Sequence, residues 1–190
     1  MPRSLAAFAL GLFPLLASAQ TAPLWLRQPA ISPDGSTIVF CYQGDLWRVP
    51  AAGGDAVLLT THEALDGAPV WSHDGQWIAF SSNRYGNGDV FVMPSAGGTA
   101  TRLTHHSNWD TPTDFTPDNS KVLFYSNRLD DANCQLFPTG GLGELYTVPI
   151  TGGRAAQVLT VPAQSARFNA SGTMLVFHDR KGYEDNFRKH

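Results

Sequence analysis

Short apolar runs separated by turn residues recur along most of this chain. In residues 69–83, PVWSHDGQWIAFSSN, an apolar pair precedes a Ser-His-Asp-Gly turn, and a second apolar run follows it at residues 77–80. Asp-Gly is a preferred corner of a β-hairpin, because glycine adopts a positive φ without a steric penalty. The pattern therefore predicts two antiparallel strands joined by a tight turn.

The same pattern occurs four times, in repeats that span about residues 29–68, 69–111, 112–165 and 166–190. The turn corners of successive repeats are separated by 40, 44 and 53 residues. A period in the low forties is expected for the four-stranded blade of a β-propeller. The corner residues are Gly35, Gly75, Asn119 and Gly172.

Each complete repeat predicts four strands. A short first strand precedes the turn, and the second strand ends in an aromatic residue. The third reads DLWRVP, DVFVMP or ELYTVP, with alternating apolar residues and a final proline, and a Gly-Gly turn leads to a fourth strand that closes on Leu-Thr. The predicted first strands are Ala30–Ser32, Val70–Ser72, Asp114–Thr116 and Arg167–Asn169.

These strands predict an all-β fold, a partial β-propeller with about three and a half four-stranded antiparallel blades. No helical spacing with a matching cap appears after residue 20. An unclosed ring leaves strand edges unpaired, so we expect the sequence to be the amino-terminal part of a larger protein.

The first nineteen residues differ from the rest. Arg3 precedes an apolar run over residues 5–16, and Ala17-Ser18-Ala19 follows. This is the pattern of a secretory signal peptide, and the run of about twelve residues is too short to span a bilayer as a helix. We expect cleavage after Ala19, a propeller segment over residues 20–190 without a membrane span, and a periplasmic or extracellular location.

Composition and charge exclude several classes of protein. The net charge is −3, from 13 basic and 16 acidic residues that are scattered along the chain, so no nucleic-acid partner is expected. Cys41 lies in an apolar strand, which is typical of a buried free thiol. Export would also permit a disulfide with Cys134, and the sequence leaves their pairing open.

We expect no catalytic residue, metal ion or cofactor in this segment. A G-x-S-x-G motif is absent, and the repeated turns account for most serines and aspartates. His105 and His106 are adjacent, so on a strand they point to opposite faces and do not share an ion easily. Trp47, Trp71 and Trp77 are interpreted as packing residues.

Three arginines follow the aromatic end of the second strand by three or four residues. Arg84, Arg128 and Arg180 should therefore lie on the same rim of successive blades. They could form a repeated ion pair between blades, or a rim of guanidinium groups that captures peptide carboxylates. Tyr85 and Tyr183 lie beside them and could add contact area.

The motif of S-P-D-G, an apolar-aromatic strand, DLWRVP, Gly-Gly and Leu-Thr resembles the propeller repeats of tricorn-type serine peptidases and of the Tol-system translocation protein. The final HDRKGYEDNFRKH is more similar to the tricorn-type branch, and the resemblance covers about residues 24–190. It implies a peptide or protein substrate, a propeller that gates or guides it, and downstream PDZ and peptidase modules in the same chain. The alternative is a non-enzymatic, Tol-like periplasmic propeller that serves as a protein-binding scaffold.

Overall fold

The computed structural model describes residues 25–128, 143–169 and 171–179, and every regular element in these ranges is a strand. The strands form three four-stranded antiparallel sheets and one two-stranded sheet, and strands that follow each other in sequence pair with each other. Over the same residues, no helix has the length and hydrophobicity needed to cross a membrane. The strands are β1 (Arg27–Ile31), β2 (Thr37–Tyr42), β3 (Asp45–Pro50), β4 (Val57–Leu58), β5 (Asp66–Trp71), β6 (Trp77–Ser82), β7 (Asp89–Pro94), β8 (Thr101–Arg102), β9 (Asp110–Phe115), β10 (Lys121–Ser126), β11 (Glu144–Pro149), β12 (Ala156–Gln157), β13 (Ala163–Phe168) and β14 (Leu175–Asp179).

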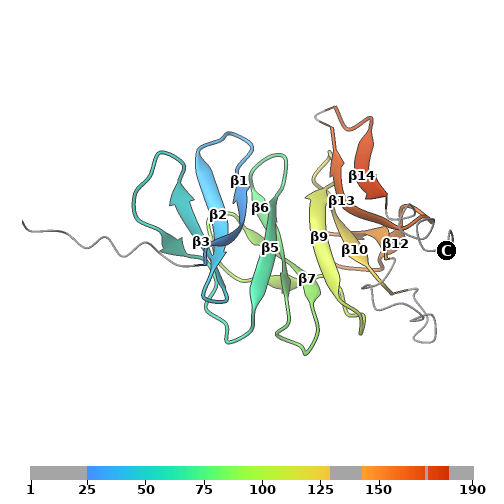
Figure 1. Ribbon diagram of the computed structural model, residues 1–190, viewed down its shortest axis with the longest axis horizontal. Helices are drawn as coiled ribbons and strands as arrows, with labels where there is room; N and C mark the ends of the chain where they lie inside the picture. The colour runs from blue at the N-terminus through green and yellow to red at the C-terminus, as the bar shows by residue number, and fades with distance from the viewer. Residues whose placement is uncertain (1–24, 129–142, 170, 180–190) are drawn as a thin grey trace, which may run out of the picture.

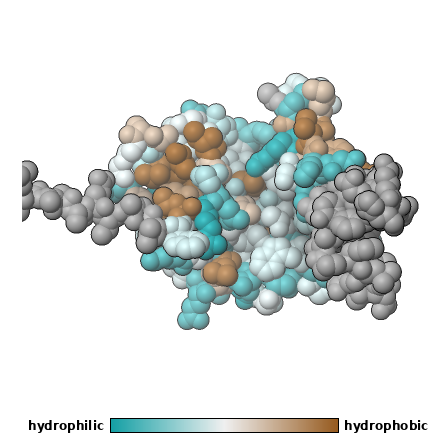
Figure 2. All heavy atoms as spheres, in the orientation of Figure 1, coloured by the Kyte–Doolittle hydropathy of each residue, from teal (hydrophilic) through white to brown (hydrophobic). Residues whose placement is uncertain are grey.

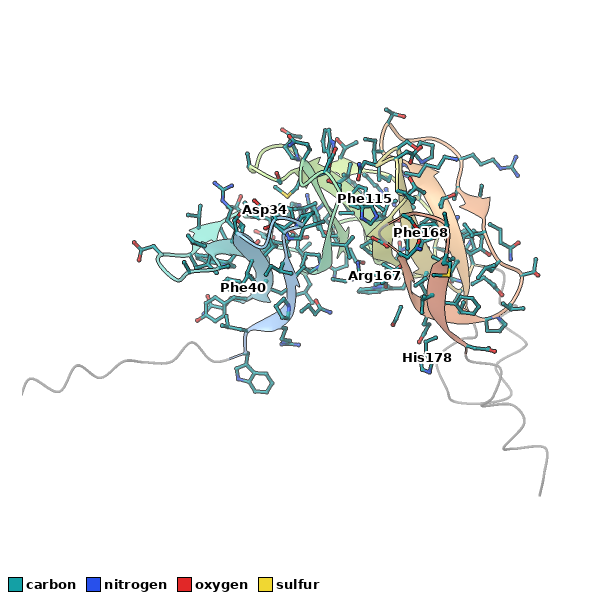
Figure 3. The ribbon with its side chains drawn as sticks, turned by 90° about the horizontal axis from the view of Figure 1, so that it is seen from above. Asp34, Phe40, Phe115, Arg167, Phe168 and His178 are labelled. Atoms are coloured by element: carbon teal, nitrogen blue, oxygen red, sulfur yellow. The ribbon has the colours of Figure 1, made fainter. Side chains whose placement is uncertain are left out.

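The sheets follow one another in chain order across the molecule (Figure 1). The first strands of neighbouring sheets contact each other, β1 with β5, β5 with β9, and β9 with β13. Seen from above, the sheets form a curved row, with Phe40 in the first sheet, Asp34 in the turn between β1 and β2, and Arg167, Phe168 and His178 in the last sheet (Figure 3). The predicted fold class is confirmed, since the molecule is an open, partial β-propeller whose inner strands are β1, β5, β9 and β13.

The hydrophobic core lies between the blades. One cluster joins the first and second sheets and includes Val39, Leu46 and Phe91. A second joins the second and third sheets, and a third joins the third sheet to β13 and β14. Strands β6, β7 and β10 are buried on both faces, which explains why their apolar runs do not alternate.

The turn between the first two strands of each blade is held by its own side chains. In the first blade, Asp34 Oδ1 accepts hydrogen bonds from Ser32 Oγ at 2.5 Å and from the backbone N–H of Ser36 at 3.0 Å. The corner residue has a positive φ, 72° at Gly35. Asn119 takes the same conformation, with a φ of 59°, because asparagine tolerates the left-handed region better than most residues.

The inner strands begin three or four residues earlier than the sequence predicted, and they end one residue earlier. Each inner strand contains a register shift against the second strand, as between Gly67 and Val70 in β5. Such a bulge places two residues opposite one and interrupts the alternation of apolar and polar residues. The pattern of alternating apolar and polar residues therefore did not predict the early part of each inner strand.

The fourth strands end before the predicted Leu-Thr pair. Strand β4 ends at Leu58 and β8 at Arg102. Beyond the end of these two strands, the threonine side chain takes over the hydrogen bonding to the third strand. Thr60 Oγ1 accepts the N–H of Leu46 at 3.0 Å, and Thr104 Oγ1 accepts the N–H of Val90 at 2.9 Å. In the first two blades, this recurring threonine therefore bonds through its side chain to the third strand.

The outermost blades of the arc carry exposed apolar side chains. Figure 2 shows apolar residues gathered over the first sheet and beside β14. They include Ile31 and Val57 in the first blade, and Met174 and Val176 at β14. In the middle blades, the apolar residues within the second and third strands are covered on both faces and contribute to the core.

Candidate functional site on the inner strands

An open cavity of about 1000 Å³ lies against the inner strands of the first three blades. Its lining comes from the start of β1 and β5, from the end of β2, and from the residues around the start of β9. Both large apolar or aromatic side chains and polar groups line this surface. The lining includes Trp25, Gln28, Tyr42, Leu65, Trp109 and Thr111.

The backbone at this cavity departs from regular strand geometry. Gln28 and Ala68, both at the bulges of their strands, have a φ of 50°, and Ser165 has 52° at the bulge of β13. Positive φ costs a non-glycine residue of order 1–2 kcal/mol. The conformation is supported by Gln28, whose Oε1 accepts the N–H of Ala68 at 2.7 Å. This bond ties the second blade to the first at the cavity wall.

Cys41 also lies in this wall and is a buried free thiol. Its Sγ donates to Gln28 Oε1 at 3.3 Å. Burial raises the pKa of Cys41 to about 11, so the thiol stays protonated and a poor nucleophile. Cys134 lies outside the described residues.

The predicted rim residue Arg84 is directed into its own blade. Its Nη2 donates to both carboxylate oxygens of Asp66, at 3.0 and 2.9 Å, and its Nε donates to Ser82 Oγ at 2.9 Å. The guanidinium carbon lies 4.6 Å from the centroid of the Phe91 ring. Asp66 has a wholly buried side chain, so the pair is shielded from solvent. The ion pair forms within one blade, whereas the sequence left open either a pair between blades or a rim of free guanidinium groups.

Arg128 repeats this arrangement in the third blade. Its Nη2 lies 2.8 Å from Asp110 Oδ2, and its Nε donates to Ser126 Oγ at 3.1 Å. Its guanidinium carbon lies 4.9 Å from the Phe124 ring and 4.7 Å from the Tyr146 ring. Both arginines therefore link the first strand of a blade to the end of its second strand.

The predicted contact residue Tyr85 lies farther out on the second blade and is 62% exposed. Its ring is stacked on Phe91, and the guanidinium of Arg102 lies 4.3 Å from its centroid. Arg102 in turn pairs with Asp89 at 2.6 Å. Burial raises the pKa of the Asp89 carboxyl, and Arg102 opposes that effect.

Arg180 and Tyr183 lie outside the described residues. The register nevertheless shows which residue of the fourth blade occupies the position of Asp66. Asp66 pairs with Ser82 and Asp110 with Ser126, whereas Ala163 pairs with Asp179. An alanine therefore replaces the carboxylate at this position in the fourth blade.

A repeated feature at this end of the blades was not predicted from the sequence. A glycine precedes the third strand in each complete blade, at Gly44, Gly88 and Gly143. Its carbonyl accepts the N–H of the first inner-strand residue of the next blade, at 2.7 Å for both Asp66 and Asp110. The recurring Gly-Asp, Gly-Asp and Gly-Glu pairs were the sequence signal that could have revealed this link.

These glycines also make room for large side chains from the next blade. A Cβ at Gly44 would lie 3.2 Å from Leu65 Cδ2, and a Cβ at Gly88 would collide with the indole of Trp109. Leu65 and Trp109 are equivalent, since each immediately precedes the aspartate that begins the inner strand. The absence of a side chain on one blade thus positions an apolar side chain of its neighbour beside the cavity.

The cavity lining combines exposed apolar side chains with amide and hydroxyl groups. Among the residues that the structure describes, no group of three or more His, Cys, Asp or Glu side chains is placed to hold a metal ion.

Comparisons with solved structures agree with this architecture. The chain is similar to the structure of TolB from Acinetobacter baumannii, with a TM-score of 0.66, 21% identity, and coverage of 83% of this chain and 38% of that one. It is also similar to the crystal structure of the tricorn protease, with a TM-score of 0.64, 20% identity, and coverage of 78% and 14%. A chain of the nidogen/laminin complex gives a TM-score of 0.59 at 13% identity, with coverage of 81% and 56%.

The chain thus spans 38% of the TolB chain and 14% of the tricorn protease chain. A search of the curated proteins found no match. The family model described as the tricorn protease N-terminal beta propeller domain matches residues 23–190. This match covers all of the described blades, and the chain therefore belongs to the family of tricorn protease N-terminal β-propeller domains.

Proposed function

We propose that this chain is the substrate-gating or protein-interaction propeller of an exported, tricorn-like serine peptidase, and that catalysis is carried out elsewhere in the protein. Membership of the tricorn N-terminal propeller family is the observation that carries the proposal. The cavity on the inner strands adds a surface at which a peptide could be held before it reaches a distant active site.

The gating role is tested by narrowing the cavity in the full gene product. Thr111 lines the cavity from β9, so Thr111→Trp should obstruct the passage of long substrates. We expect kcat/KM to fall at least fivefold for a peptide of twenty residues and to change less than twofold for a fluorogenic tripeptide. Thr99→Trp, at an exposed position in the turn before β8, is the matched control.

Three results would contradict the proposal. One is equal loss for the long and the short substrate. A second is hydrolysis by the 190-residue chain alone, which would place catalysis within this segment. A full gene product without peptidase activity would instead favour the alternative of a non-enzymatic, Tol-like scaffold.

Export is tested by the mass of the mature chain. In a bacterial host with a functional secretion system, we expect the mature protein to begin at Gln20 and to be recovered from the periplasm or the medium. Ala19→Gln should block cleavage and leave the precursor intact. A mature protein that retains residues 1–19 would contradict the predicted signal peptide.

A further inference from the structure

We propose that three equivalent side chains at the cavity bind an extended polypeptide that carries large apolar residues and a carboxylate. These side chains, Trp25, Leu65 and Trp109, are called here the apolar rim row. The inference rests on the proposed function and deepens it by naming the kind of polypeptide that the propeller selects.

The three members hold the same place in successive blades. Leu65 and Trp109 immediately precede Asp66 and Asp110. In the first blade, Arg27 pairs with Cys41 as Gly67 pairs with Ser81, which makes Trp25 the equivalent of Leu65. The repeat therefore places one large apolar side chain per blade beside the same cavity.

The members of the apolar rim row are exposed to solvent. Trp25 is 76% exposed, Leu65 63% and Trp109 52%, and none of them belongs to a hydrophobic cluster between the blades. Large apolar side chains grouped on a surface are typical of interaction sites. Packing in the core does not explain why these side chains are large and apolar. An apolar binding partner explains it better.

The local structure supports this exposure. The carbonyl of Gly88 accepts the N–H of Asp110 at 2.7 Å, and the Trp109 indole lies over Gly88 itself. Gly44 and Leu65 are arranged in the same way. Leu65 and Trp109 are thus positioned by a bond and a glycine that recur from blade to blade, and both are held against backbone.

The available charge at the cavity is positive. The charged lining residues are Arg27 and Asp66. Asp66 is buried and already paired with Arg84, whereas Arg27 is exposed, with its guanidinium carbon 5.7 Å from the Trp25 ring centroid. A carboxylate is the group that complements an exposed guanidinium beside an apolar surface.

The shape of the surface favours an elongated occupant. The row crosses three blades, so one ligand reaches all its members only if it is extended along the inner strands. In an extended peptide, alternate side chains point to the same side, which suits a row of separate apolar contacts. These features together favour a polypeptide over a small metabolite.

The experiment measures peptide binding by the full 190-residue chain. The probe is a fluorescein-labelled peptide of nine residues with alternating phenylalanine and serine and a free carboxyl end, followed by fluorescence anisotropy. We expect Leu65→Ala combined with Trp109→Ala to weaken binding at least tenfold, and Trp109→Phe to keep it within about threefold of the unsubstituted chain. The matched control is Ile31→Ala, because Ile31 is 59% exposed and lies outside the cavity lining.

The carboxylate is tested with the same peptide amidated at its end. We expect the unsubstituted chain to bind the amide at least threefold more weakly, and Arg27→Gln to bind the two peptides equally. A peptide with alanine in place of phenylalanine should bind at least tenfold more weakly. Thermal unfolding of each variant shows whether its fold is kept.

Three results would overturn the inference. They are unchanged binding by the folded rim variants, no binding of the phenylalanine peptide by the unsubstituted chain, and a dimer in sedimentation velocity that Trp109→Ala dissociates. Peptidase activity of the full gene product is measured in parallel. If the full gene product is an active peptidase but the rim substitutions do not change peptide binding, this inference fails and the proposed function stands. If the full gene product has no peptidase activity but peptide binding depends on the apolar rim row, this inference stands and the proposed function fails.

Discussion

Asp66, a buried aspartate at the start of β5, determines the surroundings of Arg84, which lies two residues after the end of β6. Asp66 is wholly buried, and a lone carboxylate in that position would be strongly destabilising. Arg84 supplies the charge and the hydrogen bonds that make this burial tolerable. The repetition of this pair at Asp110 and Arg128 makes it a structural part of the blade.

Arg84→Ala tests this assignment. The substitution leaves Asp66 buried without its partner, and breaking a buried ion pair in this way typically costs about 3–5 kcal/mol. We expect the free energy of unfolding in urea at pH 7 to fall by about that amount. Arg154→Ala, at an exposed position after the Gly-Gly turn of the third blade, should change it by about 0.5 kcal/mol or less. Equal effects of the two substitutions would contradict the structural role of Arg84.

Asp34 shows a second residue-scale effect, on the pH dependence of stability. The hydrogen bond from Ser32 and those from Ser36 lower the pKa of Asp34 to about 2. Because this pKa is lower in the folded than in the unfolded chain, the carboxylate stabilises the fold above about pH 4, and its contribution is lost as the pH falls towards 2. Asp34→Asn should therefore be destabilising at pH 7, with a difference that shrinks across this range in urea unfolding.

The matching observation is the titration of Asp34 itself. Carbon-13 NMR of its carboxyl group should give a midpoint near 2 in the native chain. Ser32→Ala should raise that midpoint, because Ser32 makes the largest contribution to the shift. A midpoint at the ordinary value in the native chain would show that the turn does not bond its carboxylate as described.

At the scale of the element, the hairpin between the third and fourth strands depends on its glycines. Gly97 and Gly98 have φ values of 97° and 129°. Apart from its two chain neighbours, no residue has an atom within 4 Å of a Cβ built on Gly98, so the cost of a side chain there comes mainly from the backbone conformation.

Gly98→Ala isolates this backbone cost. A non-glycine residue in this region is strained by about 1–3 kcal/mol. We expect a loss of that size in the free energy of unfolding, measured by thermal or urea denaturation. Thr99→Ala, at the next and equally exposed position, should have little effect. An unchanged stability in Gly98→Ala would mean that the turn can relax to another type.

At the scale of the whole molecule, Asp114 links three blades. It is 3% exposed, and its position in the inner strand is occupied by Val70 in the second blade. Its Oδ2 accepts the N–H of Phe168 in the fourth blade at 2.8 Å, and its Oδ1 lies 3.6 Å from His73 Nε2 in the second. A carboxylate thus joins blades at a position where the second blade has an apolar residue and the fourth has Arg167, whose Nη1 lies 3.7 Å from Asp114 Oδ1.

Asp114→Ala should loosen the fourth blade more than the rest of the molecule. The substitution leaves the N–H of Phe168 without its acceptor, and an unsatisfied buried group costs about 1–3 kcal/mol. We expect amide hydrogen exchange of residues 163–168 to accelerate about tenfold or more, while that of β6 and β7 changes little. Thr99→Ala, at an exposed position in the turn before β8, is the control, and uniform acceleration across all blades would contradict a local link.

The residues that line the cavity could not be predicted from the sequence repeats. Trp25, Leu65 and Trp109 appear unrelated in sequence, because two are tryptophans, one is leucine, and they lie just before the predicted repeat boundaries. Their equivalence follows from strand register, which the bulges shift. The cavity also combines residues from three blades, so no single repeat contains it.

The strands, turns and repeated blades were determined by the sequence alone, because alternating hydrophobicity and the preference of Asp-Gly and Gly-Gly for positive φ act over only a few residues. The partner of Arg84, the link from Gly88 to Asp110 and the rim row were decided only by tertiary structure. These contacts join positions eighteen or more residues apart, and they depend on burial and on how the blades are placed against one another. Local sequence patterns contain no information on how the blades are placed against one another. The fold was therefore predictable, while the surroundings of the candidate site were not.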